Sequence, residues 1–300
     1  MKFPWHKYDE IPSTRRNTAQ IFITNRCNLN CNGCFVKKVM EYSKHTMKLS
    51  SDWDMSIDEY QNIVNNALKH GCKQINILGG EPLMHPNLPS ILNFNNHFGI
   101  KTTVYTNGYF LNNFPAHVFE NTKIRISLYC KNGKLKSLDT TPEINYKYDT
   151  CFMVSKDTTV QELLETAYEL EFVRKCDDFF ISSIRELDNP NQEFFDDTDL
   201  TMPVLEYKKL VHEFLTQYIG NMRIHVSKRG VFESTLGCGY NTCMFINYFT
   251  GMGNKVIQCP YDIVNLKFQD DYEFGARHCQ HNNTCMMTKV IYQRIMGRIL

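Results

Sequence analysis

The sequence predicts an α/β fold: a partial (β/α)6 barrel, resembling part of a TIM barrel, followed by a small cysteine-rich C-terminal domain. Two observations carry this prediction. Short apolar strands alternate with amphipathic helices over the first two thirds of the 300-residue chain, and five of its 12 cysteines fall between positions 238 and 285. Strands separated by helices pair in parallel, and function in such folds collects in loops at the carboxyl ends of the strands.

The alternation can be followed element by element. The predicted strands are 19–24, 73–80, 101–108, 123–130, 149–156 and 178–186. The predicted helices are 56–71, 85–99 and 159–175. In the first helix, apolar residues at helical spacing lie between Ser56, a suitable cap, and Gly71, a suitable stop. These six strands account for a predicted domain over residues 1–187.

An acidic segment marks the predicted end of this domain. Residues 187–203 contain proline, asparagine and five acidic residues but no basic one, which is typical of a linker or lid. A helix over 204–220 and a strand over 222–226 follow, so residues 188–234 form a predicted linker region. Beyond it, two apolar strands around the turn TGMGN predict a hairpin within the C-terminal domain, residues 235–300.

Composition excludes several classes of protein. The chain has 33 basic and 32 acidic residues and no basic run, so a nucleic-acid partner is not expected. Neither a signal peptide nor a transmembrane run is visible, so we expect a cytoplasmic protein with no membrane partner. In a reducing compartment cysteines are thiols, metal ligands or catalytic groups. Four that lie singly in or beside apolar segments are expected to be buried: Cys72, Cys130, Cys151 and Cys176.

The stretch TNRCNLNCNGCF places Cys27, Cys31 and Cys34 within eight positions, directly after the first predicted strand. The residues alone leave three interpretations open. A structural zinc site would take the three thiolates plus His45 or a remote cysteine. Cys31 and Cys34 alone could form a thiol-redox pair. Three thiolates could also hold a four-iron cluster, in which one iron is open to an exogenous molecule.

The spacing resembles the signature of the radical S-adenosylmethionine (radical SAM) enzymes, and a second motif supports the resemblance. Gly79, Gly80 and Glu81 end the second predicted strand and resemble the family's glycine–glycine–glutamate motif. Glycines let the backbone approach the bound methionine group, and a nearby acceptor can hold its ammonium.

The resemblance implies a radical SAM oxidoreductase or modifying enzyme with a [4Fe-4S] cluster on the three cysteines. In that family, S-adenosylmethionine chelates the open iron and is cleaved by one electron to methionine and a 5′-deoxyadenosyl radical. The radical then abstracts a hydrogen from the substrate. An electron donor such as flavodoxin or ferredoxin is therefore expected as a partner.

Further contacts with S-adenosylmethionine are implied by position along the strands. Asn107 ends the third strand, and Ser127 lies in the fourth. Arg185, in the sixth, is suited to grip the carboxylate of the cofactor. The residue before the third cysteine is usually aromatic in the family but here is Gly33, so the adenine contact is expected at Phe35 or in another loop.

The sequence leaves the catalytic residues unknown. Candidates for a general base follow only from position, and they are the acids of residues 187–203 and Asp149.

The tail resembles the SPASM/Twitch auxiliary iron–sulfur domains of the same enzymes, in which a glycine turn precedes a cysteine. The resemblance implies a second [4Fe-4S] cluster. Its ligands would be Cys238, Cys259, Cys279 and Cys285, with Cys243 as the alternate to the first. Too few cysteines remain for a further cluster, so the shorter Twitch form is the better match. A structural zinc on the same thiolates is the alternative.

The resemblance leaves the substrate open between a peptide and a small molecule. Relatives with one auxiliary cluster include dehydrogenases of small alcohols and modifiers of ribosomally made peptides or proteins. Only 26 residues precede Cys27, which disfavours a leader-recognition domain in the same chain, and the ending MGRIL lacks the paired glycines of molybdenum-cofactor synthases. From another class, the alternative is a non-catalytic zinc-binding interaction protein.

Overall fold

The structure is a computed structural model whose described residues fall in two compact units. The first unit is Ser13–Arg125 with Tyr240–Cys279, and the second is Met1–Pro12, Ile126–Gly239 and Gln280–Leu300. The described residues are 5–8, 18–31, 34, 36, 53–69, 71–128, 130–131, 134–135, 148–183, 202–227, 245–249, 255–257, 269–270 and 289–294. Each unit is treated below by itself.

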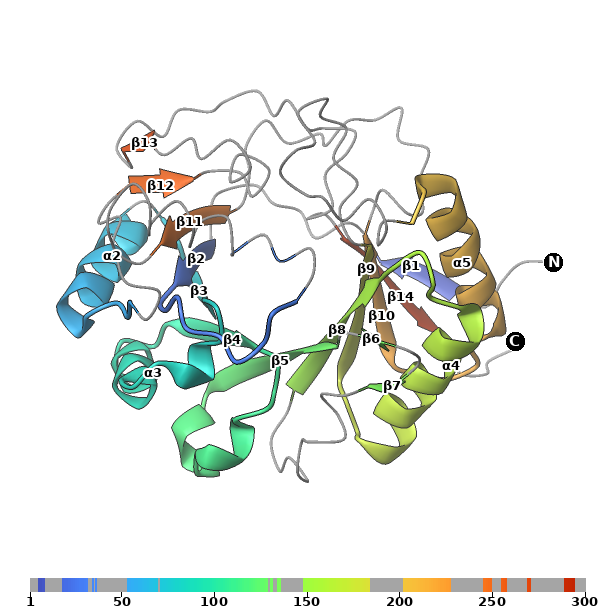
Figure 1. Cartoon of the computed structure of the whole chain (residues 1–300), viewed down its shortest axis with the longest axis horizontal. Helices are drawn as coiled ribbons and strands as arrows, with labels where there is room; N and C mark the ends of the chain where they lie inside the picture. Colours follow the sequence, from blue (N-terminus) through green and yellow to red (C-terminus); the bar gives the residue numbers. More distant parts are fainter. Residues whose placement is uncertain are drawn as a thin grey trace. The chain divides into compact units, whose positions relative to one another are not determined.

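Parallel strands form the centre of the first unit (Figure 1). β2 (Thr18–Phe22), β3 (Gln74–Leu78) and β4 (Lys101–Thr106) pair in parallel, and β5 (Thr122–Leu128) is the next neighbour of β4. Neighbours in the sheet are therefore neighbours in the chain, as in a barrel of β/α units. The carboxyl ends of β2, β3 and β4 meet at one edge of the sheet.

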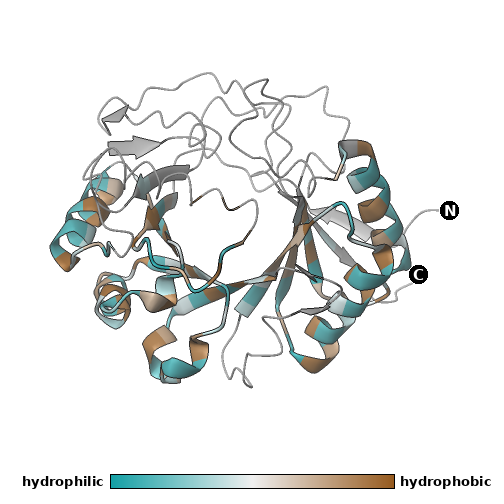
Figure 2. Cartoon of the chain, viewed as in Figure 1, coloured by the Kyte–Doolittle hydropathy of each residue, from teal (hydrophilic) through white to brown (hydrophobic). Residues whose placement is uncertain are grey.

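Two helices pack on this sheet, α2 (Ile57–Lys69) and α3 (Leu88–His97). The hydroxyl of Ser56 accepts a hydrogen bond from the Glu59 amide at 3.1 Å, and Gly71 follows the helix with a φ of +87°. The predicted start and stop of this helix are thereby confirmed. Figure 2 shows that hydrophobic and hydrophilic residues alternate along both helices, which gives each an apolar side for the core.

A buried polar network fixes the two helices to the sheet. The Asn95 amide group donates to the Tyr60 hydroxyl at 2.7 Å and to the Thr102 hydroxyl at 3.0 Å. All three side chains are buried. Their bonds join α2, α3 and β4, because buried polar groups are stable in a core only when they are partnered.

The C-terminal part of the chain adds strands to the first unit. β11 (Phe245–Phe249) pairs in parallel with β2, and β12 (Lys255–Ile257) pairs antiparallel with β11. The two strands of the hairpin predicted around TGMGN are thereby confirmed. β13 (Gln269–Asp270) continues the sheet beside β12. β11 therefore lies directly beside the strand that leads into the cysteine-rich stretch.

The second unit has its own parallel row, made of β8 (Tyr148–Val154), β9 (Asp178–Ser183) and β10 (Arg223–Ser227). α4 (Val160–Tyr168) connects β8 with β9, and α5 (Val204–Gln217) precedes β10. Figure 1 shows both helices along this row. The parallel strands and intervening helices of the two units confirm the predicted α/β class.

Shorter elements complete the description. β14 (Lys289–Arg294) pairs antiparallel with β10, and β1 (Trp5–Tyr8) pairs antiparallel with β14; no sequence pattern indicates either strand. The remaining short elements are η1 (Pro82–Met84), η2 (Leu111–Asn113), η3 (Ala116–Phe119), the π-helical turn η4 (Glu169–Val173), β6 (Cys130–Lys131) and β7 (Lys134–Leu135).

The singly placed cysteines agree only in part with the prediction that they are buried. Cys72 and Cys176 are buried, whereas Cys151 is half-buried. The reason lies in β8, where Cys151 and Met153 share the strand face that is incompletely covered. The side chain of Cys130 lies outside the described residues.

Two further expectations from the sequence concern the domain limits and membrane-spanning segments. The predicted domain limits at 187 and 234 stay predictions, because both positions lie outside the described residues. No helix in the described part of the chain is long and apolar enough to cross a membrane.

A buried acid is paired at the amino end of β9. Asp178 accepts a hydrogen bond from the His225 ring at 2.6 Å and from the Arg223 guanidinium at 2.7 Å, both from β10. The His225 ring also stacks on Phe180 at 3.9 Å. Removing one partner of a buried charged group is costly, because the remaining group stays buried without compensation.

Asp178→Ala is therefore expected to lower the free energy of unfolding by about 3 kcal/mol. Urea denaturation followed by circular dichroism measures this change. Glu213→Ala, which removes an exposed acid of α5, serves as the control and is expected to change stability by less than about 0.5 kcal/mol. Equal effects of the two substitutions would contradict the assignment of Asp178 as a structural anchor.

Candidate functional site

The cysteine loop, defined as residues 23–34, follows β2 in the first unit; its residues 32 and 33 lie outside those described. Cys27 is exposed, and Cys31 and Cys34 are half-buried, so solvent reaches all three side chains. The Leu29 amide donates a hydrogen bond to the Cys27 sulfur at 3.4 Å. Within the described residues, no three His, Cys, Asp or Glu side chains are grouped closely enough to hold a metal ion.

The glycine–glycine–glutamate motif packs directly on the start of the cysteine loop. The Gly80 amide donates to the Thr24 carbonyl at 2.8 Å, and the Glu81 amide donates to the Arg26 carbonyl at 2.7 Å. A Cβ at Gly80 would overlap the Arg26 carbonyl oxygen, and one at Gly79 would lie 2.9 Å from the Thr24 side chain. The contact between the two loops therefore requires glycine at both positions. The motif in the sequence does not reveal this packing role.

The Glu81 carboxylate joins the ends of β3 and β4. It is buried, with 1% of the residue exposed. One oxygen accepts from the Thr106 hydroxyl at 2.7 Å and the Leu83 amide at 3.0 Å, and the other accepts from the Asn107 amide at 2.8 Å. These bonds engage both oxygens with protein donors, so the expected contact of Glu81 with the ammonium of S-adenosylmethionine stays a prediction.

Burial also changes the protonation of Glu81. It raises the pKa of this carboxyl from 4.5 to about 7, although the three hydrogen bonds to the carboxylate act in the opposite direction. The loss of hydration therefore outweighs the donors that the protein supplies.

Asn107 connects the loop after β4 to the cysteine loop. Its side-chain amide donates to the Asn28 oxygen at 2.8 Å, while its own oxygen accepts from the Tyr109 amide at 3.1 Å. The turn continues through Gly108, whose φ of +84° favours glycine. Asn107 was expected to touch the cofactor, and the structure additionally gives it a contact within the protein.

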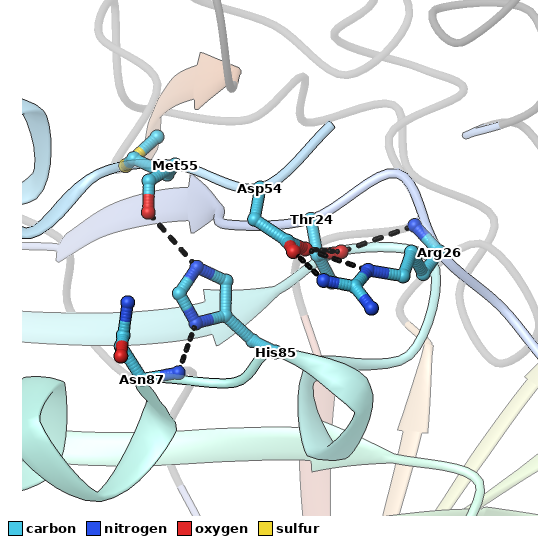
Figure 3. A network of polar contacts seen from close by, with 6 residues as sticks. All are labelled: Thr24, Arg26, Asp54, Met55, His85 and Asn87. Carbon is cyan, nitrogen blue, oxygen red and sulfur yellow. Dashed lines mark hydrogen bonds and ion pairs between the residues drawn. The ribbon is translucent and has the colours of Figure 1, made fainter. Parts of the chain in front are cut away.

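A second polar network involves Arg26, the residue before Cys27, and no sequence motif indicates it (Figure 3). The Arg26 guanidinium forms a forked contact with the Asp54 carboxylate, in which Nε lies 3.2 Å from Oδ1 and a terminal nitrogen bonds Oδ2. The Thr24 hydroxyl donates to the same carboxylate at 2.6 Å. Asp54 falls in a stretch with no recognisable motif, so no pattern could have identified it.

His85 supports the segment that carries Asp54 (Figure 3). Its Nδ1 accepts from the Asn87 amide at 3.1 Å, which leaves Nε2–H to donate to the Met55 carbonyl at 2.9 Å. Burial lowers the pKa of His85, so the neutral ring that this pattern needs is favoured.

Two of the remaining predicted site residues lie in strands, and the others lie outside the described residues. Ser127 is half-buried in β5. Asp149 is fully buried near the amino end of β8, away from that strand's carboxyl end, where function was expected. Outside the described residues lie Gly33, Phe35, His45, Arg185, Cys238, Cys243, Cys259, Cys279 and Cys285.

Gly80→Ala should displace the cysteine loop, because the added methyl group meets backbone that cannot rotate away. We expect a loss of about 3 kcal/mol in the free energy of unfolding, measured by urea denaturation. Gly99→Ala is the matched control: its Cβ meets open space and only a φ of +64° opposes it, so a loss of about 1 kcal/mol is expected. A smaller loss at Gly80 than at Gly99 would contradict the close approach of the loops.

Glu81→Gln is expected to destabilise the protein most at low pH. The folded chain holds the Glu81 proton more tightly than the unfolded chain, so the wild type loses stability as pH rises from 4.5 to about 7. Because glutamine does not titrate, the deficit of the variant should shrink over that range by up to about 3 kcal/mol. Unfolding free energies at several pH values measure it, and a deficit that grows with pH would mean that the ionised form is favoured.

Comparison with known proteins bears on these features. Residues 21–128 match the model of the radical SAM superfamily. A probable GTP 3′,8-cyclase of Methanococcus maripaludis is 33% identical over 129 residues, 43% of this chain and 38% of that protein. A 7-carboxy-7-deazaguanine synthase of Aquifex aeolicus is 27% identical over 150 residues, 50% of this chain and 61% of that protein. The matches thus span less than two thirds of either relative.

A solved structure extends the likeness in fold. SuiB of Streptococcus suis, bound to S-adenosylmethionine, matches with a TM-score of 0.62 and 18% identity, covering 87% of this chain and 64% of SuiB. SuiB has also been solved bound to its precursor peptide SuiA. At this identity the likeness concerns the fold, and it confirms the predicted α/β architecture of an open, partial barrel. The family match itself covers residues 21–128, in which the cysteine loop meets the glycine–glycine–glutamate motif, and it identifies this part of the chain as a radical SAM domain.

Proposed function

We propose that the protein is a radical SAM enzyme that reductively cleaves S-adenosylmethionine and abstracts a hydrogen from its substrate. The observation that carries the proposal is the junction at the carboxyl ends of β2, β3 and β4. There the cysteine loop is bonded through its backbone to Gly80 and Glu81. This edge is where (β/α) folds place their chemistry.

The cysteine loop suits an iron–sulfur cluster in the chemistry and spacing of its side chains, and binding would draw together three thiols that are not grouped in the part of the chain that the structure describes. Cys27, Cys31 and Cys34 supply three soft thiolate donors from one short loop, and all three are accessible to solvent. When bound, a [4Fe-4S] cluster with three thiolate ligands supplies an iron open to S-adenosylmethionine and the electron that cleaves it to methionine and a 5′-deoxyadenosyl radical.

The chain's own residues would position these reactants. The Leu29 amide stabilises negative charge on the Cys27 sulfur, and Glu81 holds the loop after β4 against the cysteine loop through Asn107. Gly79 and Gly80 keep side chains out of the junction. Ser127, Arg185 and Phe35 remain the proposed contacts to S-adenosylmethionine.

For the substrate, a small molecule is our first proposal. The two curated relatives described above are named for a guanine nucleotide and a deazaguanine, although the matches cover only part of each. A peptide is the second candidate, because SuiB shares the fold and has been solved with a precursor peptide. Oxidation and other modification both remain within the proposal, and flavodoxin or ferredoxin is the proposed class of electron donor.

The tail is proposed to hold a second [4Fe-4S] cluster in a Twitch-type domain. The ligands would be Cys238, Cys259, Cys279 and Cys285, with Cys243 as the alternate to the first. Support comes from the confirmed strands of the hairpin, β11 and β12, which precede Cys259 in the sequence.

Anaerobic reconstitution with iron and sulfide tests the proposed function. We expect a brown protein with about eight irons, as two four-iron clusters require, and formation of 5′-deoxyadenosine after reduction in the presence of S-adenosylmethionine. Cys31→Ala should abolish this cleavage. A colourless protein that takes up zinc and forms no 5′-deoxyadenosine would overturn the proposal in favour of a zinc-binding interaction protein.

Cys259→Ala tests the second cluster separately. We expect the variant to lose about four irons and the ability to complete substrate turnover, while some uncoupled formation of 5′-deoxyadenosine persists. The matched control is Cys72→Ala, which removes a buried thiol outside both cysteine groups. Unchanged iron content in the Cys259 variant would exclude this residue as a ligand.

A further inference from the structure

The two residues that flank Cys27 are each tethered to a different segment of the first unit. Arg26 bonds Asp54, which lies 28 residues further along the chain. Asn28 bonds Asn107, which lies 79 residues further along. Cys27 is thus held between two side-chain contacts, and neither contact belongs to the recognised motifs of the loop.

The partner of Arg26 is itself fixed. Thr24 and Asp54 form an isolated antiparallel bridge, and the Met55 amide donates to the Ile23 carbonyl at 2.8 Å. Asp54 also accepts from the Thr24 hydroxyl at 2.6 Å. A forked guanidinium–carboxylate contact sets orientation as well as distance, because two bonds share one plane. The Arg26 side chain is therefore held in one orientation.

The partner of Asn28 is likewise fixed by its own hydrogen bonds. Asn107 is buried, its amide donates to Glu81 at 2.8 Å, and its side-chain oxygen accepts from Tyr109. Because its oxygen is engaged by the Tyr109 amide, the side-chain nitrogen is the group presented to Asn28. Asn28 therefore has to supply an acceptor.

We infer that Arg26, Asp54 and Asn28 are positioning residues that hold Cys27 in place as a ligand before any cluster is bound, with Asn107 as the fixed point for Asn28. The inference rests on the proposed function for the nature of the group bound, but not for the ordering of the loop itself. A loop ordered in advance loses less conformational freedom when its thiol binds, so the bound group is released more slowly.

Hydrogen exchange of the metal-free protein tests the ordering directly. Asn28→Ala should speed amide exchange in peptides covering residues 24–31 by about fivefold, as expected for loss of one net hydrogen bond. Asn28→Asp keeps an acceptor oxygen and should restore wild-type exchange. Asn30→Ala is the matched control, because Asn30 is exposed in the same loop. Equal exchange in all three variants would overturn the inference.

Iron release tests whether the ordering matters for the bound group. After reconstitution, the rate at which a chelator removes iron should rise about fivefold in Asn28→Ala and return to the wild-type rate in Asn28→Asp. The melting temperature of Asn28→Ala is expected to stay at the wild-type value. A merely structural role of Asn28 would instead lower it. Faster release in Asn30→Ala as well would contradict the assignment.

A double-substitution cycle tests the other tether. Arg26→Met and Asp54→Asn should each speed iron release by about fivefold, and the double variant should match the larger single effect, because both remove one interaction. Additive effects would contradict the positioning pair.

If the wild type binds zinc and forms no 5′-deoxyadenosine, the proposed function fails. The exchange measurement on the metal-free protein still decides the ordering of the loop.

Discussion

The candidate site depends on one close approach, in which the backbone of Gly80 and Glu81 lies against the backbone of the cysteine loop. Two amide–carbonyl bonds, to Thr24 and Arg26, hold the loops together at 2.8 and 2.7 Å. Only glycine permits this spacing, because a Cβ at Gly80 would overlap the Arg26 carbonyl. The contacts of Asp54 and Asn107 join the same stretch of the loop, at Arg26 and Asn28.

Glu81 shows what this arrangement costs in free energy. A carboxylate 1% exposed loses its hydration, and its pKa of about 7 records that loss even with three donors present. The carboxyl is needed for its geometry, because the backbone amides of Leu83 and Asn107 donate to different oxygens and each requires an acceptor. An amide at this position would place a donor against a donor. The motif's acid thus acts first as a connection between strand ends.

The C-terminal strands add a connection between the two cysteine-rich parts of the chain. β11 pairs in parallel with β2 over five residues, from Phe245 opposite Thr18 to Phe249 opposite Phe22. Because β2 leads into the cysteine loop, the hairpin that precedes Cys259 in the sequence is hydrogen-bonded to the strand that precedes Cys27. Paired strands hold each other at a fixed spacing and register. The position of β11 is therefore linked to that of β2 and of the cysteine loop that follows it.

The sequence by itself determined the strand–helix alternation, the capped helix from Ser56 to Gly71, the hairpin strands and the two motifs of the radical SAM domain. These are local properties, set by periodicity, turn chemistry and the spacing of a few residues. Only the tertiary structure decided that Arg26 meets Asp54, that Asn28 meets Asn107, and that β1 pairs with β14. Such partners are separated by 28, 79 or more residues and follow no period, so they exist only once the strands have placed their ends at a common edge.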